Sequence, residues 1–364
     1  MYRTSVLAAL SVLGAYLAWS SSDTWQDAPF SLDKTSLQRV IECPRGISGA
    51  PGGIILLISG TTASGGDEWP GTPYWEYLPY ESPGYDICWF NNPSKGLGDA
   101  QLSSEYIAYN VPLLAKKSAT GNVAFIGHSQ GAGVTPQWAL SFWPSIRKYV
   151  SANIMIAPPF HGILDLPNLC VAWWGMTECF PSFFQMNAGS AFMLAKNKRG
   201  GNLVPTTSIW SRVDGVVVPP ESAFIDGAEN IAVQQHDICG SGATTDHSMS
   251  ICIVTQLYTA HRLTDGAAHM VVDPAVYALA VDALRNGGRA SAARFDATKS
   301  CHGFANTTHS QSYFSATADR INNIIAQPNA STTYQASGYS LTAVEPPLKA
   351  YVCKQGQATV CGST

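Results

Sequence analysis

The pentapeptide GHSQG, residues 127–131, directly follows the apolar run NVAFI, residues 122–126, and directly precedes a helical pattern. In that pattern Val134, Trp138 and Phe142 recur every four residues, which is the spacing of one helix face. A strand, a sharp turn with a central serine flanked by glycines, and then a helix form the nucleophile elbow of α/β-hydrolases. A tight turn with a capping serine is the alternative, and the strand-turn-helix frame favours the elbow.

Segments of strand and helix type alternate around the elbow. Further strands are expected at residues 53–59, 85–90, 153–157, 206–210 and 230–235, and further helices at residues 102–117, 248–262 and 274–285. Pro112 falls inside the first of these helices and is expected to kink or break it. The alternation predicts an α/β fold: a three-layer αβα sandwich whose mostly parallel central sheet carries helices on both faces.

The bulk composition narrows the class of protein. The chain has 364 residues with 46% hydrophobic and 13% charged side chains, and its formal net charge is −4. This balance is typical of a globular protein with one large core and is opposite to that of a disordered chain. Without a run of Lys or Arg, the sequence gives no indication of a nucleic-acid partner.

The N-terminus has the pattern of an export signal. Arg3 precedes an apolar stretch at residues 6–17, and Ala18 and Ser20 fit a small-residue cleavage site. The stretch is shorter than the roughly 20 residues that a membrane-spanning helix needs, so no stable membrane anchor is expected. We therefore expect residues 1–20 to be removed. Residues 21–364 would then form a single catalytic domain with a C-terminal segment at 306–364. Within that segment, residues 306–344 are rich in Ser, Thr, Asn and Ala and are expected to form a loose, glycosylated surface segment.

Two further features agree with secretion. Asn306 and Asn329 each begin an N-glycosylation triplet. The chain also has nine cysteines, and most are expected to pair in an oxidising compartment. No CxxC or HExxH motif occurs, so no metal site is expected, and Cys252 is the candidate for the unpaired thiol.

A serine hydroxyl is a weak nucleophile until a base removes its proton, so Ser129 requires a histidine, and the histidine requires a carboxylate to orient it. In α/β-hydrolases these residues follow the order Ser, acid, His along the chain. Asp214 follows an apolar strand, and His247 lies between a strand-like segment and a predicted helix. These positions predict the triad Ser129, Asp214 and His247.

Other candidates for the base and the acid are weaker. His236 lies in or at the end of a predicted strand, His261 ends a predicted helix, and Asp226 precedes a glycine as turn residues do. His128 is too close to Ser129 along the chain to act as its base. The remaining histidines are expected to be structural or exposed: His161, His269, His302 and His309.

The sequence resembles a known family, the fungal serine lipases and esterases similar to Candida antarctica lipase B. The resemblance covers residues 43–265, and a second, shorter stretch of similarity lies at 345–361. Its matching stretches follow in order: ILLISGTT at 55–62, CWFNNP at 88–93, SQG at 129–131, QWAL at 137–140, FWPSIR at 142–147, VPTTS at 204–208, CG at 239–240 and DH at 246–247.

The resemblance implies the same triad, and it implies Thr61 as one donor of the oxyanion hole. The amide of Gln130, the residue after the nucleophile, is the expected second donor. Substrate-pocket walls are expected from His128, Val216 and Val217. Two positions depart from the family: His128 replaces a tryptophan, and Pro159 replaces an aspartate. Both departures affect the shape and polarity of the pocket.

The resemblance also implies a disulfide between Cys43 and Cys88. Cys170 with Cys179 and Cys353 with Cys361 are close pairs along the chain, and Cys239 with Cys301 would use the rest.

The expected function is that of a secreted, extracellular lipase or carboxylesterase that cleaves lipid-type esters through an acyl-enzyme, without a cofactor. Its partner would be an ester substrate, which could lie at a lipid–water interface, and the enzyme would be a monomer. An acyltransferase with the same triad is one alternative, and a non-catalytic lipid-binding relative is another. The aromatic segment 167–184 would either pack into the core or form a disulfide-stapled apolar rim.

Overall fold

The structure, a computed structural model, describes residues 26–247, 269–304, 308–325 and 340–362. Its centre is a seven-stranded sheet in the order β1-β3-β2-β4-β5-β6-β7. The strands are β1 (Ile41–Glu42), β2 (Ile54–Ile58), β3 (Asp86–Phe90), β4 (Val123–His128), β5 (Val150–Ile156), β6 (Thr206–Trp210) and β7 (Glu229–Ala232). All neighbouring strands are parallel except β1, which pairs antiparallel with β3.

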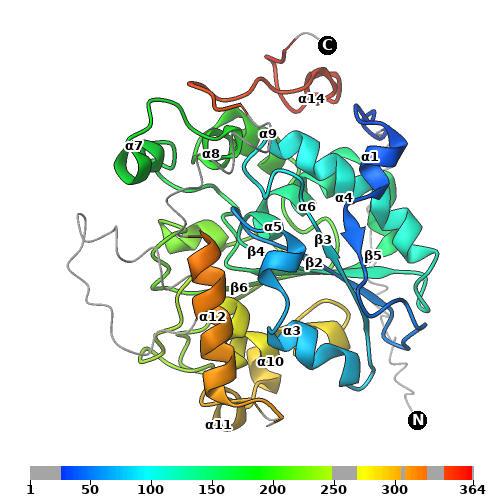
Figure 1. Cartoon of the computed structure of the whole chain (residues 1–364), viewed down its shortest axis with the longest axis vertical. Coiled ribbons are helices and arrows are strands. Elements are labelled where there is room, and N and C mark those ends of the chain that lie inside the picture. The colour runs from blue at the N-terminus through cyan, green and yellow to red at the C-terminus, as the bar shows by residue number, and fades with distance from the viewer. Residues whose placement is uncertain (1–25, 248–268, 305–307, 326–339, 363–364) are drawn as a thin grey trace, which may run out of the picture.

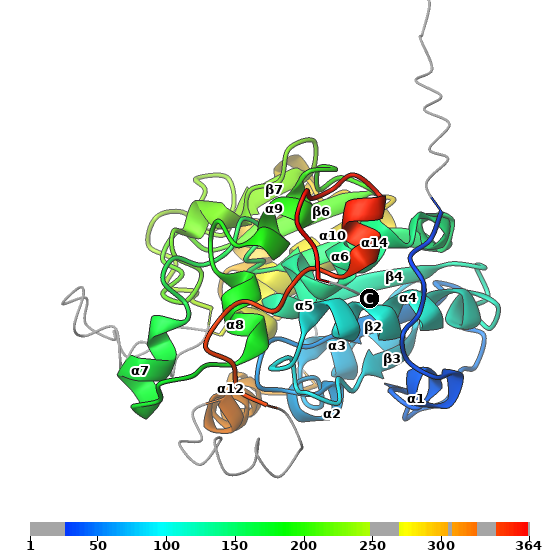
Figure 2. The ribbon, with the colours of Figure 1, turned by 90° about the horizontal axis from the view of Figure 1, so that it is seen from above.

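Helices cover both faces of this sheet. The helices of the described residues are α1 (Lys34–Gln38), α2 (Gly65–Glu68), α3 (Pro73–Glu76), α4 (Ala100–Ala115), α5 (Gln130–Gly133), α6 (Thr135–Phe142), α7 (Asn168–Trp174), α8 (Pro181–Met186), α9 (Ala191–Asn197), α10 (Pro274–Arg285), α11 (Ala297–Ser300), α12 (Gln311–Ile325) and α14 (Ala350–Lys354). Figure 1 shows α4 and α6 on one side of the sheet and α10 on the other, and Figure 2 shows the same arrangement from above.

The core is divided by the sheet because successive side chains of a strand point to opposite faces. Leu56 of β2 belongs to the hydrophobic cluster that contains Trp138 of α6. Its neighbour Leu57 belongs to the other cluster, together with Leu279 of α10. All five residues of β2 are buried, which explains why this strand is a continuous apolar run. The fold is the expected three-layer α/β-hydrolase fold.

The predicted break at Pro112 is wrong. Helix α4 runs from Ala100 through Pro112 to Ala115. The proline lies in the last turn, where the helix is about to end and little of it remains to be disturbed. The helix loses one backbone hydrogen bond at Pro112 but continues to Ala115, two residues before the expected end at Lys117.

The expectation of an irregular segment over residues 306–344 is also wrong in part, because α12 forms within it. Phe314, Ala318 and Ile321 of α12 are buried in the core, at the i, i+4, i+7 spacing of an amphipathic helix. Arg320 donates hydrogen bonds to backbone carbonyls of the α2 region, including those of Glu68 and Pro70. Ser, Thr and Asn on the exposed side of the helix obscure this pattern in the sequence.

Four disulfides join the pairs expected from the sequence: Cys43–Cys88, Cys170–Cys179, Cys239–Cys301 and Cys353–Cys361. Several other predictions fall outside the described residues: the export signal, the glycosylation sites Asn306 and Asn329, Cys252, and the helix at 248–262. Among the helices that the structure describes, none combines the length and apolarity needed to cross a bilayer.

Candidate active site

The predicted site residues gather at one edge of the sheet, where the parallel strands have their carboxyl ends. Thr61 follows β2, Ser129 follows β4, Asp214 follows β6 and His247 lies in the chain that continues beyond β7. Ligands of open α/β sheets bind at this edge, because loops from neighbouring strands converge there. The topology therefore places all four residues on one side of the molecule.

Ser129 occupies a strained turn between β4 and α5. Its backbone has φ 53° and ψ −121°, a conformation that side-chain-bearing residues rarely adopt. The glycines of the pentapeptide leave no room for a side chain: a Cβ on Gly131 would lie 2.3 Å from the carbonyl oxygen of Ser59, and one on Gly127 would lie 1.9 Å from that of Gly131. This is the geometry of a nucleophile elbow.

His247 and Asp214 are in direct contact. Nδ1 of His247 lies 3.0 Å from Oδ2 of Asp214, and both side chains are buried. The other carboxylate oxygen of Asp214 accepts the backbone N–H groups of Val216 and Val217 at 2.9 and 2.7 Å. Asp214 therefore has a fixed orientation, and Oδ2 is the oxygen left to hold the imidazole.

A second carboxylate holds the backbone of the same loops. Oδ1 of Asp246 accepts the N–H of Gly215 at 3.0 Å and the N–H of His247 at 2.6 Å. Asp246 thus links the residue after Asp214 to His247 itself. No local sequence pattern marks Asp246, because its two contacts form only where the loops of Gly215 and His247 meet.

The environment of His247 favours the charged imidazole. Burial alone would lower the pKa of His247, but the charge of Asp214 and its hydrogen bond outweigh burial, and Asp246 and Glu68 act in the same direction. The pKa of His247 is therefore raised above its ordinary value. A base of this kind can accept a proton from a neighbouring hydroxyl and hold it while a reaction proceeds.

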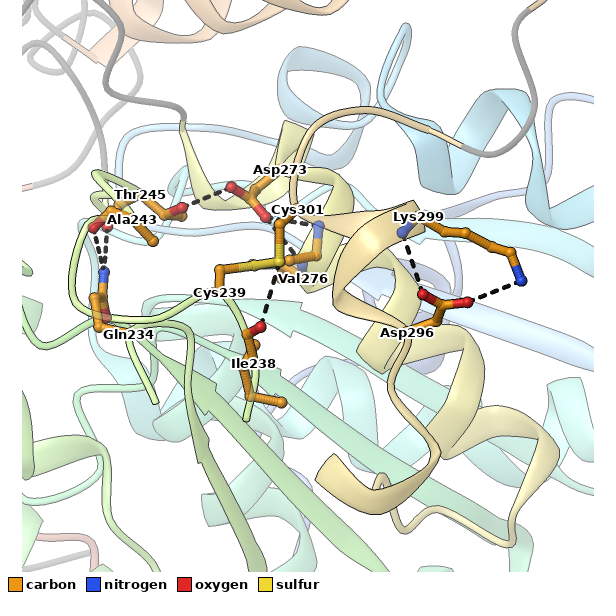
Figure 3. The surroundings of a disulfide bond; sticks show 11 residues. Gln234, Ile238, Cys239, Ala243, Thr245, Asp273, Val276, Asp296, Lys299 and Cys301 are labelled. Carbon is orange, nitrogen blue, oxygen red and sulfur yellow. Dashed lines mark hydrogen bonds and ion pairs between the residues drawn. A yellow bond between two sulfur atoms is a disulfide. The ribbon is translucent and has the colours of Figure 1, made fainter. Parts of the chain in front are cut away.

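The loop that carries His247 is anchored to α10 and β7. Figure 3 shows the hydroxyl of Thr245 bound to Asp273, with Oγ1 and Oδ2 2.6 Å apart, and Gln234 turned toward the carbonyls of Ala243 and Thr245. Asp273 also accepts two backbone N–H groups at the start of α10. The disulfide Cys239–Cys301 closes the same region. The loop that leads to His247 is therefore held by contacts with several elements.

The candidate oxyanion donors lie on neighbouring loops. The side chain of Gln130 donates to the carbonyl of Gly96 at 2.8 Å, and a Cβ on Gly96 would lie 3.2 Å from Cα of Thr61. The loop at Gly96 therefore packs against both residues. Their expected role as donors stays a prediction.

The predicted pocket walls differ in exposure. His128 and Val217 are only 2% and 1% exposed, whereas Val216 is partly exposed. Val217 packs in the core cluster that contains α4 and α6. Nδ1 of His128 lies 2.6 Å from Oε1 of Glu68 beneath the site. The pocket-lining role of these residues stays a prediction.

Two fungal lipases are similar to this chain. No protein-family model matches the chain. Lipase B of Pseudozyma antarctica is 29% identical over 237 residues, which are 62% of this chain and 65% of that protein. The crystal structure of Aspergillus fumigatus lipase B superposes with a TM-score of 0.71 at 27% sequence identity, covering 90% of this chain and 73% of that chain.

The chain is homologous to fungal lipase B. The expected resemblance is thereby confirmed, and so is the α/β-hydrolase fold. The match spans less than two thirds of the length of the P. antarctica protein. In this chain, His247 and Asp214 meet at the sheet edge that also carries the Ser129 elbow.

Proposed function

We propose that this protein is a serine hydrolase that cleaves carboxylic esters through an acyl-enzyme. The observation that carries the proposal is the buried His247–Asp214 hydrogen bond at the sheet edge where Ser129 occupies the strained turn. Homology to two lipases supports an ester as the substrate. Four disulfides support a secreted, extracellular enzyme, and we propose residues 21–364 as its single catalytic domain.

The mechanism follows from the roles that each group can take. His247, in the tautomer with its proton on Nδ1 and held by Asp214, accepts the hydroxyl proton of Ser129 as Oγ attacks the ester carbonyl. The tetrahedral oxyanion is stabilised by the amides of Gln130 and Thr61. His247 then protonates the leaving alcohol, and an acyl-enzyme remains. Water, deprotonated by His247, attacks this ester, and the acid and free Ser129 are released.

The proposal is tested by covalent labelling and by a substrate panel. A fluorophosphonate probe should modify one residue, Ser129, in the native protein and none after heat denaturation. The protein should hydrolyse p-nitrophenyl esters within a series from C2 to C16. Absence of both labelling and ester hydrolysis in a folded preparation would refute the proposed function. Release of the acyl group to an added alcohol in preference to water would instead identify an acyltransferase.

The first prediction concerns pH. His247 must be neutral to take the proton of Ser129, so kcat/KM should rise as the pH increases through the pKa of His247. Because this pKa is raised, the midpoint should lie above about 6.5, the ordinary value of an imidazole. Ester hydrolysis followed from about pH 5 to 9 measures the midpoint. A flat profile, with the protein folded throughout, would exclude a histidine base.

The second prediction concerns long acyl chains. In the segment 167–184, Phe180 and Phe183 are buried in the core, while Val171 of α7 is exposed; the side chains of Trp173 and Trp174 lie outside the described part. The core interpretation therefore holds for the two phenylalanines. Outside this segment, Leu164 and Val218 also expose apolar side chains, and Val218 directly follows the candidate pocket residue Val217. We expect these two side chains to contact the acyl chain or a lipid.

Leu164 and Val218 are 58% and 42% exposed, and the amide of Leu164 donates to the carbonyl of Val218 at 2.9 Å. Changing both to serine removes several methylene contacts worth about 0.8 kcal/mol each, so kcat/KM for a C16 ester should fall roughly 10-fold or more. Activity on a C4 ester and the Tm should change little.

Tyr80→Ser is the matched control, because Tyr80 is 77% exposed and lies before the amino-terminal end of β3, at the opposite edge of the sheet. It should leave both activities unchanged. Equal losses on C4 and C16 esters in the rim variant would count against a role in chain-length preference.

A further inference from the structure

Glu68 is a buried carboxyl that the proposed mechanism does not use. It is the last residue of α2, and it is 1% exposed. One carboxyl oxygen accepts the backbone N–H of Gly60 at 2.8 Å. The other lies 2.6 Å from Nδ1 of His128, in an arrangement that is short but poorly aligned for a hydrogen bond. Glu68 thus contacts two segments that are far apart in the sequence.

These two segments carry the candidate oxyanion donors. Gly60 directly precedes Thr61, and His128 directly precedes the pair Ser129 and Gln130. The segments also touch each other, since a Cβ on Gly60 would lie 3.2 Å from both Nδ1 of His128 and Cβ of Ser129. Stabilisation of an oxyanion depends on donors held at about 2.7 to 3.1 Å from its oxygen. A small shift between the segments would therefore weaken it.

The contact between Glu68 and His128 belongs to a larger cluster of buried titratable side chains. The ring of His128 lies 4.8 Å from that of His247 and 5.3 Å from that of His269, measured between centroids. A parallel bridge between Asp246 and His269 brings His269 to the site. Nδ1 of His269 accepts the N–H of Val271, so its neutral ring carries the proton on Nε2.

A buried cluster of this kind costs folding free energy relative to an apolar core of the same volume. Nε2 of His128 and Nε2 of His269 have no hydrogen-bond partner among the residues that the structure describes. The cluster is therefore poorly explained by stability. The cluster contacts both the elbow and the oxyanion loop, and this position points to a role in the reaction.

We propose that Glu68 is a positioning residue, which through Gly60 and His128 fixes the spacing between the oxyanion loop and the nucleophile elbow. The proposal rests on the proposed function, because it assigns Glu68 to the oxyanion hole of that reaction. Glu68 does not touch the reacting atoms; it acts through the two segments that do.

The charge of Glu68 gives the proposal a second, independent test, which is the pH dependence of the reaction. Burial raises the pKa of Glu68 to about 7, opposed by the Gly60 N–H and by the charges of His247 and Arg320. Burial lowers the pKa values of His128 and His269 well below the ordinary value, so both rings stay neutral. Glu68 is then the group of this cluster that changes charge in the range where His247 titrates.

The sign of the effect on His247 is fixed by Coulomb's law. Ionised Glu68 raises the pKa of His247, as Asp214 and Asp246 do. Glu68→Gln removes this charge and should shift the acid midpoint of kcat/KM to lower pH. A purely structural defect would lower activity at every pH without moving the midpoint. In the wild type, the rise of kcat/KM on the acid side should also extend over a wider pH range than a single ionisation gives, because Glu68 and His247 interact and titrate together.

The experiment compares three variants with the wild type: Glu68→Gln, Glu68→Leu and Asp86→Asn. Glutamine keeps an acceptor for the Gly60 N–H, whereas leucine loses both contacts. Asp86 is a matched control, since its buried carboxylate accepts the N–H groups of Ser48, Gly49 and Ala50 at the opposite end of the strands. The measurements are Tm, and kcat and KM for p-nitrophenyl butyrate as a function of pH.

Glu68→Gln should lower kcat roughly 10-fold with little change in KM, and Glu68→Leu should lower it by about 10²-fold, the scale of a lost oxyanion donor. The midpoint should move down in Glu68→Gln. Asp86→Asn should lower Tm without changing kcat or the midpoint. The proposal would be overturned if Glu68→Gln kept the wild-type kcat and the wild-type midpoint. It would also be overturned if kcat fell in proportion to the loss of Tm in all three variants.

Fluorophosphonate labelling separates this proposal from the proposed function. If the wild-type protein is not labelled at Ser129, the proposed function fails and the role of Glu68 fails with it. If the wild type is labelled and both Glu68 variants are labelled at the same rate, the role of Glu68 alone is refuted. Slower labelling of Glu68→Leu than of Asp86→Asn supports the role, because phosphonylation also places an oxygen in the oxyanion hole.

Discussion

Replacement of Ser129 by alanine should lower kcat for ester hydrolysis by roughly 10⁴- to 10⁶-fold, as removal of the nucleophile does in other serine triads. The substitution removes the hydroxyl that forms the acyl-enzyme, so the residual rate would come from the oxyanion donors acting on water. The fold should be retained, because Ser129 is bound into the elbow by its backbone, whose N–H donates to the carbonyl of Ile156 at 2.9 Å. The assay is p-nitrophenyl butyrate hydrolysis together with Tm.

The matched control for this variant is Ser141→Ala. Ser141 is also a buried serine, and its hydroxyl has no partner within the described residues. It lies in α6, away from the carboxyl edge of the sheet. The control should keep wild-type activity and fluorophosphonate labelling, and Ser129→Ala should lose both. A folded Ser129→Ala protein that kept a tenth of the activity would show that the nucleophile is a different residue.

The elbow could be predicted from the sequence because all of its determinants are local. The strand at β4, the glycines and the helix face beginning at Val134 occupy one continuous stretch of about twenty residues. The central strands were predicted for a related reason: a parallel strand buried on both faces, such as β2, has to be apolar throughout. The outermost strand β1 has only two residues and was not predicted.

The candidate acid and base were predicted by chain order and family resemblance, not by local pattern. His247 and Asp214 are 33 residues apart, and only the structure shows their 3.0 Å contact. Glu68 and His128 are sixty residues apart in sequence and 2.6 Å apart in space. No local pattern marks Glu68, because a charged residue in a Gly-rich stretch is typical of a solvated turn. One signal was present: a histidine directly before the nucleophile, on a buried strand, needs a polar partner.

Replacement of Asp214 by asparagine should lower kcat by about 10⁴-fold, through the wrong tautomer of His247. The structure indicates how the amide would orient. Oδ1 of Asp214 accepts two backbone N–H groups, from Val216 and Val217, so the carbonyl oxygen of the introduced asparagine would keep that position. Its NH₂ group would then face Nδ1 of His247 and donate to it. The imidazole proton would be placed on Nε2, where the ring cannot accept the proton of Ser129.

Asp246→Asn separates this tautomer effect from simple loss of charge near the imidazole. Asp246 also raises the pKa of His247, but its Oδ1 is bound to the amides of Gly215 and His247, and an asparagine can keep both contacts. It should shift the acid midpoint of kcat/KM to lower pH and lower kcat by no more than about 10-fold, the scale of one lost charge interaction near the site. The measurements are kcat and the pH profile of both variants, with Tm to confirm folding.

If Asp214→Asn and Asp246→Asn lost activity equally, charge alone would explain the role of Asp214. A difference of two to three orders of magnitude would instead show that Asp214 acts by fixing which nitrogen of His247 carries the proton.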